Sequence, residues 1–267
     1  MTTIKNLINL SGRRALITGA AGGLGKIIAS TLAELGADLL LVDQKEVELD
    51  QIKMLIIDRW RVRVDCQICD LEQQLQRDQL ISYIKQSTLK LNILVNNAAF
   101  VGTSDLQGWA VPFEQQSIDT WRRALEVNLT SAFHLSQGLM SLLKSAEGAN
   151  IINIGSIYGM YGPDWKLYEG TNMANPAAYS VSKGGLNQLT RWLSSTVAPH
   201  VRVNTLSPGG IFRNQRENFI KKYESKTPLA RMASEDDFRG TIAYLASDLS
   251  AYVTGQNISV DGGWGVW

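Results

Sequence analysis

The sequence RALITGAAGGLG at residues 14–25 decides the fold. Residues 14–18 form a short apolar, strand-like run, and an apolar helical pattern over 24–35 begins inside the glycine cluster that follows. The cluster consists of Gly19, Gly22, Gly23 and Gly25, with Leu24 among them. Glycine permits a tight turn and lets the main chain approach a ligand, and the first N–H groups of a helix attract phosphate. The stretch therefore predicts a strand, a turn and a helix that bind the pyrophosphate of a dinucleotide.

Outward from this stretch, strand-like runs alternate with helical patterns along the chain. The predicted strands are 14–18, 38–42, 63–69, 91–95, 150–154, 201–206 and 256–260, and the predicted helices include 24–35, 46–59, 72–86, 118–143 and 178–198. This alternation demands crossover connections and hence a parallel sheet. We expect an α/β protein with a doubly wound Rossmann fold, in which helices cover both faces of a seven-stranded, mostly parallel sheet. Since no linker or repeat interrupts the pattern, residues 1–267 are expected to form one domain.

Composition argues against several other classes of protein. The 267 residues include 26 basic and 25 acidic side chains, so the net charge of +1 gives no overall attraction to nucleic acid or to an anionic membrane. No apolar run reaches the roughly 18 residues of a membrane span, and the first residues lack a signal-peptide core. A cytoplasmic protein is expected. Cys66 and Cys69 fall in the strand 63–69 on opposite faces, without a second Cys/His pair, so no metal site is predicted.

The acidic residue after the second predicted strand bears on the choice of cofactor. Asp43 follows Gly25 by 18 residues, a position from which a carboxylate can accept hydrogen bonds from an adenosine ribose. The carboxylate would also repel the 2′-phosphate of NADP, and no arginine stands beside it or in the glycine cluster. The nearby Lys45 reads as a solvated lysine at the start of a helix. The sequence therefore favours NAD over NADP.

A tyrosine and a lysine stand one helical turn apart within the predicted helix 178–198. Tyr179 and Lys183 are four residues apart, so both side chains project from one face of that helix. A free tyrosine has a pKa of about 10, and a neighbouring ammonium group stabilises the phenolate and lowers that pKa. We therefore predict that the pair works as a general acid and base at neutral pH.

The motifs occur together in a pattern that is similar to a known family. TGAAGGLG at 18–25, NNAA at 96–99, YSVSK at 179–183, SPGG at 207–210 and VTGQNISVDGG at 253–263 resemble the motifs of the short-chain dehydrogenase/reductase family. The resemblance covers nearly the whole chain and implies an oxidoreductase that uses a nicotinamide cofactor. It also implies that Tyr179 exchanges the proton of the substrate oxygen and that Lys183 holds the nicotinamide ribose. Ser156 would hydrogen-bond the reacting oxygen, and Asn128 would position a water next to Lys183.

The same resemblance implies a set of cofactor contacts. These are Asp70 and Leu71 at the adenine, Asn97 and Ala98 at a strand end, and Pro208, Gly209 and Ile211 against the nicotinamide. Ala99 replaces the glycine that is usual in the family, and Arg213 stands where members usually have a threonine. One carboxamide or phosphate contact is therefore open. Because the last strand commonly packs across a subunit interface in this family, a homotetramer or homodimer is expected.

A long segment between two of these motifs is a candidate substrate-binding element. Ser156 and Tyr179 are 23 residues apart, more than the family usually has, so residues 157–178 are interpreted as an inserted substrate loop. Its candidate substrate residues are Tyr158, Trp165 and Tyr168, because aromatic faces near carboxylates suit a polyhydroxylated ligand. Packing of these rings against the loop itself or against another subunit is the alternative. The pattern YGxxxPD…YEGT…NP in this loop resembles family members that modify bacterial surface sugars and flagellin.

Residues 209–234 form a second irregular segment, which we interpret as a substrate lid with Arg213 as a candidate substrate contact. Between 212 and 226 the lid has five basic and two acidic residues, and this excess could attract a sugar phosphate, a sugar acid or a nucleotide-linked sugar. A solvated helix face is the alternative interpretation of the same charges.

The expected function is the NAD(H)-dependent interconversion of a secondary alcohol and a ketone on a polar sugar-like or sugar-acid substrate. Two alternatives stay open: an NAD-assisted dehydratase or epimerase acting on a nucleotide sugar, and a dinucleotide-binding regulator without catalysis. A regulator needs no proton relay, so the presence of Ser156, Tyr179 and Lys183 counts against it.

Overall fold

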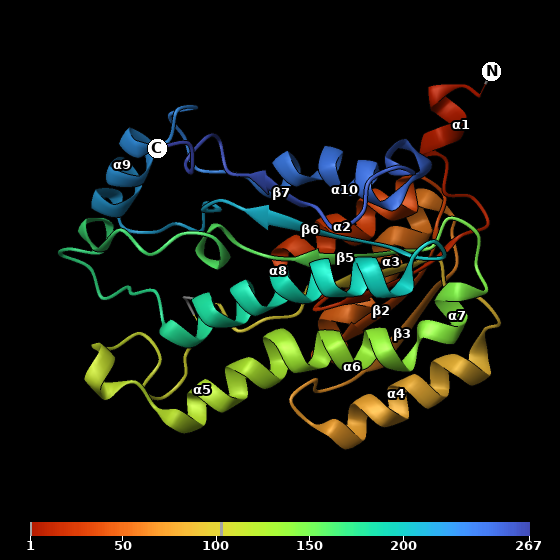
Figure 1. The fold of residues 1–267 in the computed structure, drawn as a ribbon, viewed down its shortest axis with the longest axis horizontal. Coiled ribbons are helices and arrows are strands. Elements are labelled where there is room, and N and C mark those ends of the chain that lie inside the picture. The colour runs from red at the N-terminus through yellow and green to blue at the C-terminus, as the bar shows by residue number, and fades with distance from the viewer. Residues whose placement is uncertain (1, 102–103) are drawn as a thin grey trace.

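A parallel sheet runs through the described part of the chain, residues 2–101 and 104–267 of a computed structural model (Figure 1). Its strands are β1 (Arg14–Thr18), β2 (Asp38–Asp43), β3 (Val64–Ile68), β4 (Ile93–Asn96), β5 (Asn150–Ile154), β6 (Arg202–Pro208) and β7 (Asn257–Val260). Their order in the sheet is β3-β2-β1-β4-β5-β6-β7, and every neighbouring pair is parallel. The predicted Rossmann sheet is confirmed, and it is parallel throughout rather than mostly parallel.

The order of the strands reverses beside β1. The chain moves outward from β1 to β2 and β3, then returns to the other side of β1 with β4 and continues to β7. At such a reversal the loops at the carboxyl ends of neighbouring strands turn away from each other, which leaves a crevice for a ligand. The glycine cluster follows β1 and therefore lies at this crevice.

Helices cover both faces of the sheet (Figure 1). The α-helices are α1 (Ile4–Ile8), α2 (Gly23–Glu34), α3 (Glu46–Trp60), α4 (Gln74–Ser87), α5 (Ile118–Leu125), α6 (Ser131–Gly138), α7 (Met140–Lys144), α8 (Ala177–Val197), α9 (Glu217–Lys226) and α10 (Arg239–Ala246). Short 3₁₀ turns are η1 (Phe113–Gln115), η3 (Ile157–Gly159), η4 (Trp165–Leu167), η5 (Glu235–Phe238) and η6 (Asp248–Ser250), and η2 (Glu126–Thr130) is a π-helix.

Two apolar cores result from the alternation of side chains along the strands. Ile17 of β1 faces the core shared with α2, α3 and α10, whereas its neighbour Leu16 faces the core shared with α4, α6 and α8. Both side chains are fully buried, because successive strand residues point to opposite faces and helices cover each face. Because both faces of these strands are buried, the strands appear in the sequence as uninterrupted apolar runs.

The predicted single helix 118–143 is wrong in its interior. The π-helix η2 separates α5 from α6, and the chain bends again at Leu139 (φ −99°, ψ 3°) before α7. The π-turn contains Glu126, whose carboxylate pairs with the buried guanidinium of Arg77 on α4. The residues of this stretch are ordinary helix formers, so the extra residue per turn has no signal in the local sequence.

The described residues also bear on two other expectations. Within residues 2–101 and 104–267, no helix is both long and apolar enough to cross a membrane. The second expectation concerns Cys66 and Cys69, which are both free thiols. Burial is the main cause that raises the pKa of each thiol, to about 11 for Cys69.

Candidate active site

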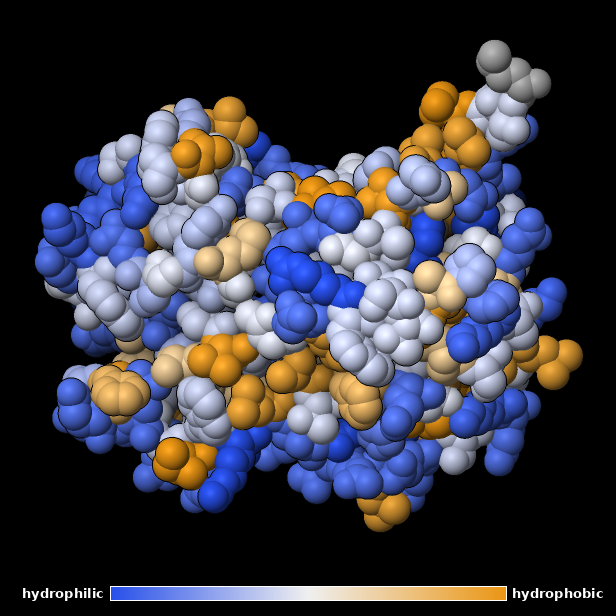
Figure 2. Space-filling model, in the orientation of Figure 1, coloured by the Kyte–Doolittle hydropathy of each residue, from blue (hydrophilic) through white to orange (hydrophobic). Residues whose placement is uncertain are grey.

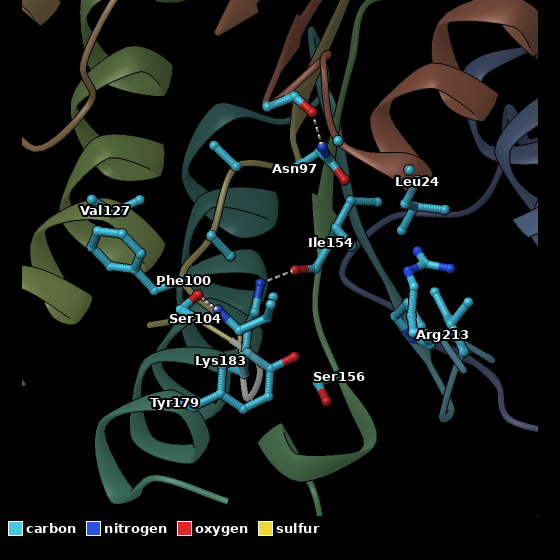
Figure 3. Close-up of a pocket in the computed structure, with 18 of the residues that line it drawn as sticks. Leu24, Asn97, Phe100, Ser104, Val127, Ile154, Ser156, Tyr179, Lys183 and Arg213 are labelled. Atoms are coloured by element: carbon cyan, nitrogen blue, oxygen red, sulfur yellow. Dashed lines mark hydrogen bonds between the residues drawn. The ribbon is translucent and has the colours of Figure 1, made fainter. Parts of the chain in front are cut away.

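A cavity of about 780 Å³ opens at the carboxyl ends of the strands and crosses the point where the strand order reverses. Asp43, the last residue of β2, and Asp70, which follows β3, line it on one side of β1, and Ser156, which follows β5, lines it on the other. Figure 3 shows Ser156, Tyr179 and Lys183 together at one end of the cavity, with Leu24 and Arg213 opposite them. The structure therefore brings the predicted cofactor residues to one cavity with Ser156, Tyr179 and Lys183, whereas Asn128 does not line it.

The glycine cluster forms the floor of this cavity because its backbone is packed too tightly for side chains. Gly19 has φ +63°, and a Cβ atom there would lie 2.8 Å from Cα of Ala98. A Cβ atom on Gly25 would overlap the carbonyl oxygen of Gly19 and lie 2.8 Å from Cα of Ala20. These approaches place the loop after β1 against the residues that follow β4, and the start of α2 against that loop, as a main chain that binds pyrophosphate requires.

Hydrogen bonds between β1 and β4 hold the loop in place. Asn97 donates its side-chain amide to the carbonyl oxygens of Thr18 (2.9 Å) and Gly19 (3.0 Å). The hydroxyl of Thr18 accepts the N–H groups of Asn97 (3.0 Å) and Ala98 (3.1 Å). Thr18 is 2% exposed, so its hydroxyl would cost free energy without these partners. Thr18 was missed as a site residue, although its place directly before Gly19 is a signal that could have found it.

Asp43 is held by main-chain amides where β2 meets the cavity. Its carboxylate accepts the N–H groups of Ala21 (2.9 Å), Gln44 (2.8 Å) and Lys45 (3.3 Å). The loop after β3 is ordered in a similar way, since Asp70 accepts the N–H of Glu72 at 3.0 Å. Acceptor groups near the cavity wall and side-chain-free backbone at its floor fit the ribose and the pyrophosphate of a dinucleotide.

The predicted catalytic residues come from α8 and from the end of β5. Lys183 donates to the carbonyl oxygen of Ile154 (2.7 Å), and its Nζ atom lies 5.9 Å from the centre of the Tyr179 ring (Figure 3). The Ser156 hydroxyl accepts the N–H of Tyr158 (3.1 Å), which fixes the turn after β5. Both Ser156 and Lys183 are buried, so their polar atoms are directed by the protein rather than by solvent.

Burial works against the acidification that the sequence predicts for Tyr179. Burial raises the pKa of the Tyr179 phenol, and the hydrogen bond from Ser156 lowers it by less. Burial also lowers the pKa of Lys183 to about 8, because the ammonium group loses its hydration. Burial therefore opposes the lowering of the Tyr179 pKa that the sequence analysis attributes to Lys183, and that lowering stays a prediction.

The comparison with known proteins identifies the family. A family model described as "Enoyl-(Acyl carrier protein) reductase" matches residues 19–265. The chain belongs to the short-chain dehydrogenase/reductase family. A tropinone reductase homolog of Arabidopsis thaliana is 34% identical over 96% of this chain and 94% of its own length. Post-translational flagellin modification protein A of Campylobacter coli is 29% identical over 96% of this chain and 100% of its own length.

A solved structure agrees with this assignment. A gluconate 5-dehydrogenase from Burkholderia cenocepacia, in complex with NADP and tartrate, matches with a TM-score of 0.87 and 26% identity, over 99% of this chain and 100% of that chain. This short-chain dehydrogenase/reductase is thus an oxidoreductase that uses a nicotinamide dinucleotide to interconvert alcohols and ketones.

In this short-chain dehydrogenase/reductase, Asn128 lies on the π-helix η2 and points at the loop after β4. Its side-chain oxygen accepts the N–H of Phe100 (2.7 Å), and its amide donates to the carbonyl oxygen of Phe100 (3.1 Å) and to the hydroxyl of Ser182 (3.0 Å). Asn128 therefore ties Phe100, which lines the cavity, to Ser182, the residue before Lys183 on α8. Its predicted role toward a water at Lys183 stays a prediction.

One end of the cavity is walled by aromatic side chains from two segments. Tyr158 and Tyr168 of the inserted loop share a hydrogen bond between their hydroxyls (2.6 Å), and Phe219 and Tyr223 of α9 complete the wall. Burial is the main cause that raises the pKa of Tyr168 to about 12. Phe219 and Tyr223 were missed, although their spacing of four residues in the predicted lid is a helical signal.

Two predicted substrate residues, Trp165 and Arg213, lie apart from this aromatic wall. Trp165 does not line the cavity; its ring packs on Tyr168 with centroids 5.9 Å apart and is 57% exposed. Arg213 lines the cavity, but at the start of α2 rather than at the tyrosines, and it pairs with Glu235. Trp165 is a correction, because its distance from the cavity depends on how the inserted loop folds back, whereas the role of Arg213 toward a substrate stays a prediction.

The cationic lid also differs from the expectation. Lys226 pairs with Asp164 (2.8 Å) and lies 4.7 Å from the ring centre of Trp264, while Lys222 donates to the carbonyl oxygen of Lys166 (2.7 Å). Among the five basic residues between 212 and 226, which are all described, Arg213 alone lines the cavity. The other charges fasten α9 to the inserted loop or face solvent, so they do not support recruitment of an anionic substrate.

Proposed function

We propose that this protein interconverts a secondary alcohol and a ketone with NAD(H), on a compact sugar-like substrate. One observation carries the proposal: Ser156, Tyr179 and Lys183 meet in the same cavity as the glycine cluster and Asp43. A dinucleotide that follows this cavity from Asp43 would end beside the catalytic residues. The inserted loop 157–178 and the lid 209–234 would enclose the substrate at that end.

The proposed mechanism divides the work among three side chains. In the reductive direction Tyr179 gives its phenolic proton to the substrate oxygen, and in the oxidative direction it takes the proton from the hydroxyl. Ser156 donates a hydrogen bond to the same oxygen, and Lys183 holds the ribose hydroxyls. A bound nicotinamide supplies the hydride for reduction and accepts it in oxidation. Because burial raises the pKa of Tyr179, the phenol is protonated at neutral pH and ready for reduction.

The substitution Tyr179→Phe tests this mechanism. It removes the exchangeable proton and keeps the ring, so turnover should fall by about 10² to 10⁴-fold with a panel of sugar-derived ketones. The dissociation constant for NAD, measured by calorimetry, should stay within about threefold of the wild-type value, because the ring still fills its place. Full turnover by this variant would contradict the proposed role of Tyr179.

The proposed preference for NAD rests on Asp43. Its carboxylate lines the cavity and is fixed by three main-chain N–H groups, so a 2′-phosphate placed there would meet a negative charge that cannot turn away. Calorimetric titration should give a dissociation constant for NAD at least about tenfold lower than for NADP. Asp43→Ser should narrow this gap, since it removes the charge. Tighter binding of NADP by the wild-type protein would overturn the preference.

The proposed substrate class follows from the aromatic wall. Tyr158, Tyr168, Phe219 and Tyr223 offer ring faces for C–H groups, and the tyrosine hydroxyls offer hydrogen-bond partners for a polyol. The lid lysines Lys222 and Lys226 are bound to other groups, which favours a neutral sugar over a sugar acid. Turnover of matched pairs of neutral and acidic sugars, followed by the absorbance of NADH, tests this preference for a neutral sugar. Faster turnover of simple ketones without hydroxyls would contradict the sugar-like class.

We also propose that the protein is a homotetramer or homodimer. Figure 2 shows apolar surface where α6 and α8 face the viewer. Phe133 of α6 and Val181 and Trp192 of α8 are 41%, 49% and 55% exposed. Large apolar side chains gathered on one face often mark an interface between subunits. Light scattering during size-exclusion chromatography should give a mass of two or four chains, and a monomer would contradict the proposal.

A further inference from the structure

An ion pair lies directly over the first residue of α2. A Cβ atom on Gly23 would stand 2.9 Å from Nη2 of Arg213 and 2.9 Å from Oε1 of Glu235. The same two side chains form a salt bridge with each other, and both are about one-third exposed, at 39% and 27%. Figure 3 shows Arg213 beside Leu24, on the far side of the cavity from Tyr179. The pair therefore occupies the mouth of the cavity at the glycine cluster.

The backbone holds both partners in this position. The chain around Ile211 forms a parallel bridge with Ala233, and Phe212 donates its N–H to the carbonyl oxygen of Ala233 (2.8 Å). Arg213 and Glu235 each follow this bridge by two residues, so both side chains leave the same small ribbon toward α2. Their position is thus set by main-chain pairing rather than by free surface rotation.

The charges around the glycine cluster indicate which kind of ligand the Arg213 guanidinium could bind. The glycine cluster has no charged side chain of its own, and its free N–H groups mark the positive end of α2. Of the other cations that line the cavity, Lys45 follows Asp43 at the end of β2, Arg123 pairs with Glu72 (2.7 Å), and Lys183 donates to a backbone carbonyl. Among the described residues, Arg213 is the cation that lies beside Gly23. The carboxylate of Glu235 lies at the N-terminus of α2, which attracts an anion.

We propose that Arg213 binds the pyrophosphate of the dinucleotide and that Glu235 is its exchangeable counter-ion. Without dinucleotide, the Glu235 carboxylate holds the guanidinium over Gly23. When the dinucleotide enters, its pyrophosphate takes the place of the carboxylate on the guanidinium and at the start of α2, and Glu235 moves into solvent. This inference rests on the proposed use of NAD(H), and it gives the two partners opposite effects on affinity.

Calorimetric titration of the full chain with NAD, ADP and adenosine tests the proposal. Arg213→Met should raise the dissociation constants for NAD and ADP about tenfold, because a charge-assisted contact to phosphate is lost. The dissociation constant for adenosine, which has no phosphate, should not change. Glu235→Gln should lower the dissociation constant for NAD several-fold, because it removes the competing carboxylate. Both effects should shrink in 0.5 M salt, which screens exposed charges.

Arg216→Met is the matched control, since Arg216 is exposed on the same segment and does not line the cavity. It should leave all three dissociation constants within about twofold. If Glu235→Gln weakens binding as Arg213→Met does, the pair is a structural clamp and the inference is wrong. Unchanged NAD binding by Arg213→Met also overturns it, while leaving the proposed function intact. No NAD binding by the wild-type protein would instead defeat the proposed function itself.

Discussion

Lys183 offers a test of the active site that needs no substrate. Its side chain is 2% exposed, and burial lowers its pKa from 10.5 to about 8. The unfolded chain therefore binds more protons than the folded chain between these two pH values, so the free energy of unfolding rises with pH across this window. Since one pKa unit is worth about 1.36 kcal/mol, the burial of the charged lysine costs about 3 kcal/mol at neutral pH.

The variant Lys183→Met isolates this cost because it keeps the length of the side chain and removes the titratable group. Urea unfolding of the dinucleotide-free protein at intervals between pH 7 and pH 10.5 measures the free energy of unfolding of each form. Relative to Lys183→Met, the wild-type protein should gain about 3 kcal/mol over this range, because its lysine is neutral in the fold at the upper end.

Lys144→Met is the control for this experiment, because Lys144 is exposed at the end of α7. Its difference from the wild-type protein should stay level over the same pH range, since an exposed ammonium keeps its hydration on folding. A level difference for Lys183→Met as well would refute the reasoning. The buried ammonium would then be compensated by partners, and the argument from burial to the state of Tyr179 would lose its basis.

Two further substitutions test the scaffold of the site. Gly25→Ala should abolish measurable NAD binding in calorimetry, because the new Cβ atom would overlap the carbonyl oxygen of Gly19. Gly162→Ala is the control and should bind NAD normally, because a Cβ atom there meets nothing within 4 Å. NAD binding by both variants would show that the glycine loop can shift to accommodate the new side chain. Glu126→Ala should lower the free energy of unfolding by about 2 to 3 kcal/mol in urea, since Arg77 is 1% exposed and would lose its carboxylate partner; a loss below about 0.5 kcal/mol would mean that water replaces it.

Predictions from the local sequence pattern were confirmed where the structure depends on residues that are close together in the sequence. The limits of β1 and β5 are those predicted, because a run of apolar, β-branched residues between polar flanks specifies a strand buried on both faces. The π-helix η2 was missed, since its residues are ordinary helix formers and the partner of Glu126, Arg77, lies on another helix. The wall residue Phe219 was missed because α9 becomes part of the cavity only by packing on the inserted loop.

The sequence by itself determined the alternation of strands and helices, the glycine cluster after β1, and the spacing of Tyr179 and Lys183. These depend on interactions within a few residues, and such interactions repeat wherever the same pattern occurs. The tertiary structure alone decided that Arg213 lies over Gly23, that Glu235 meets it, and that burial governs the pKa of Tyr179. Desolvation and ion pairing depend on which distant segments come together, and that arrangement exists only after the chain has folded.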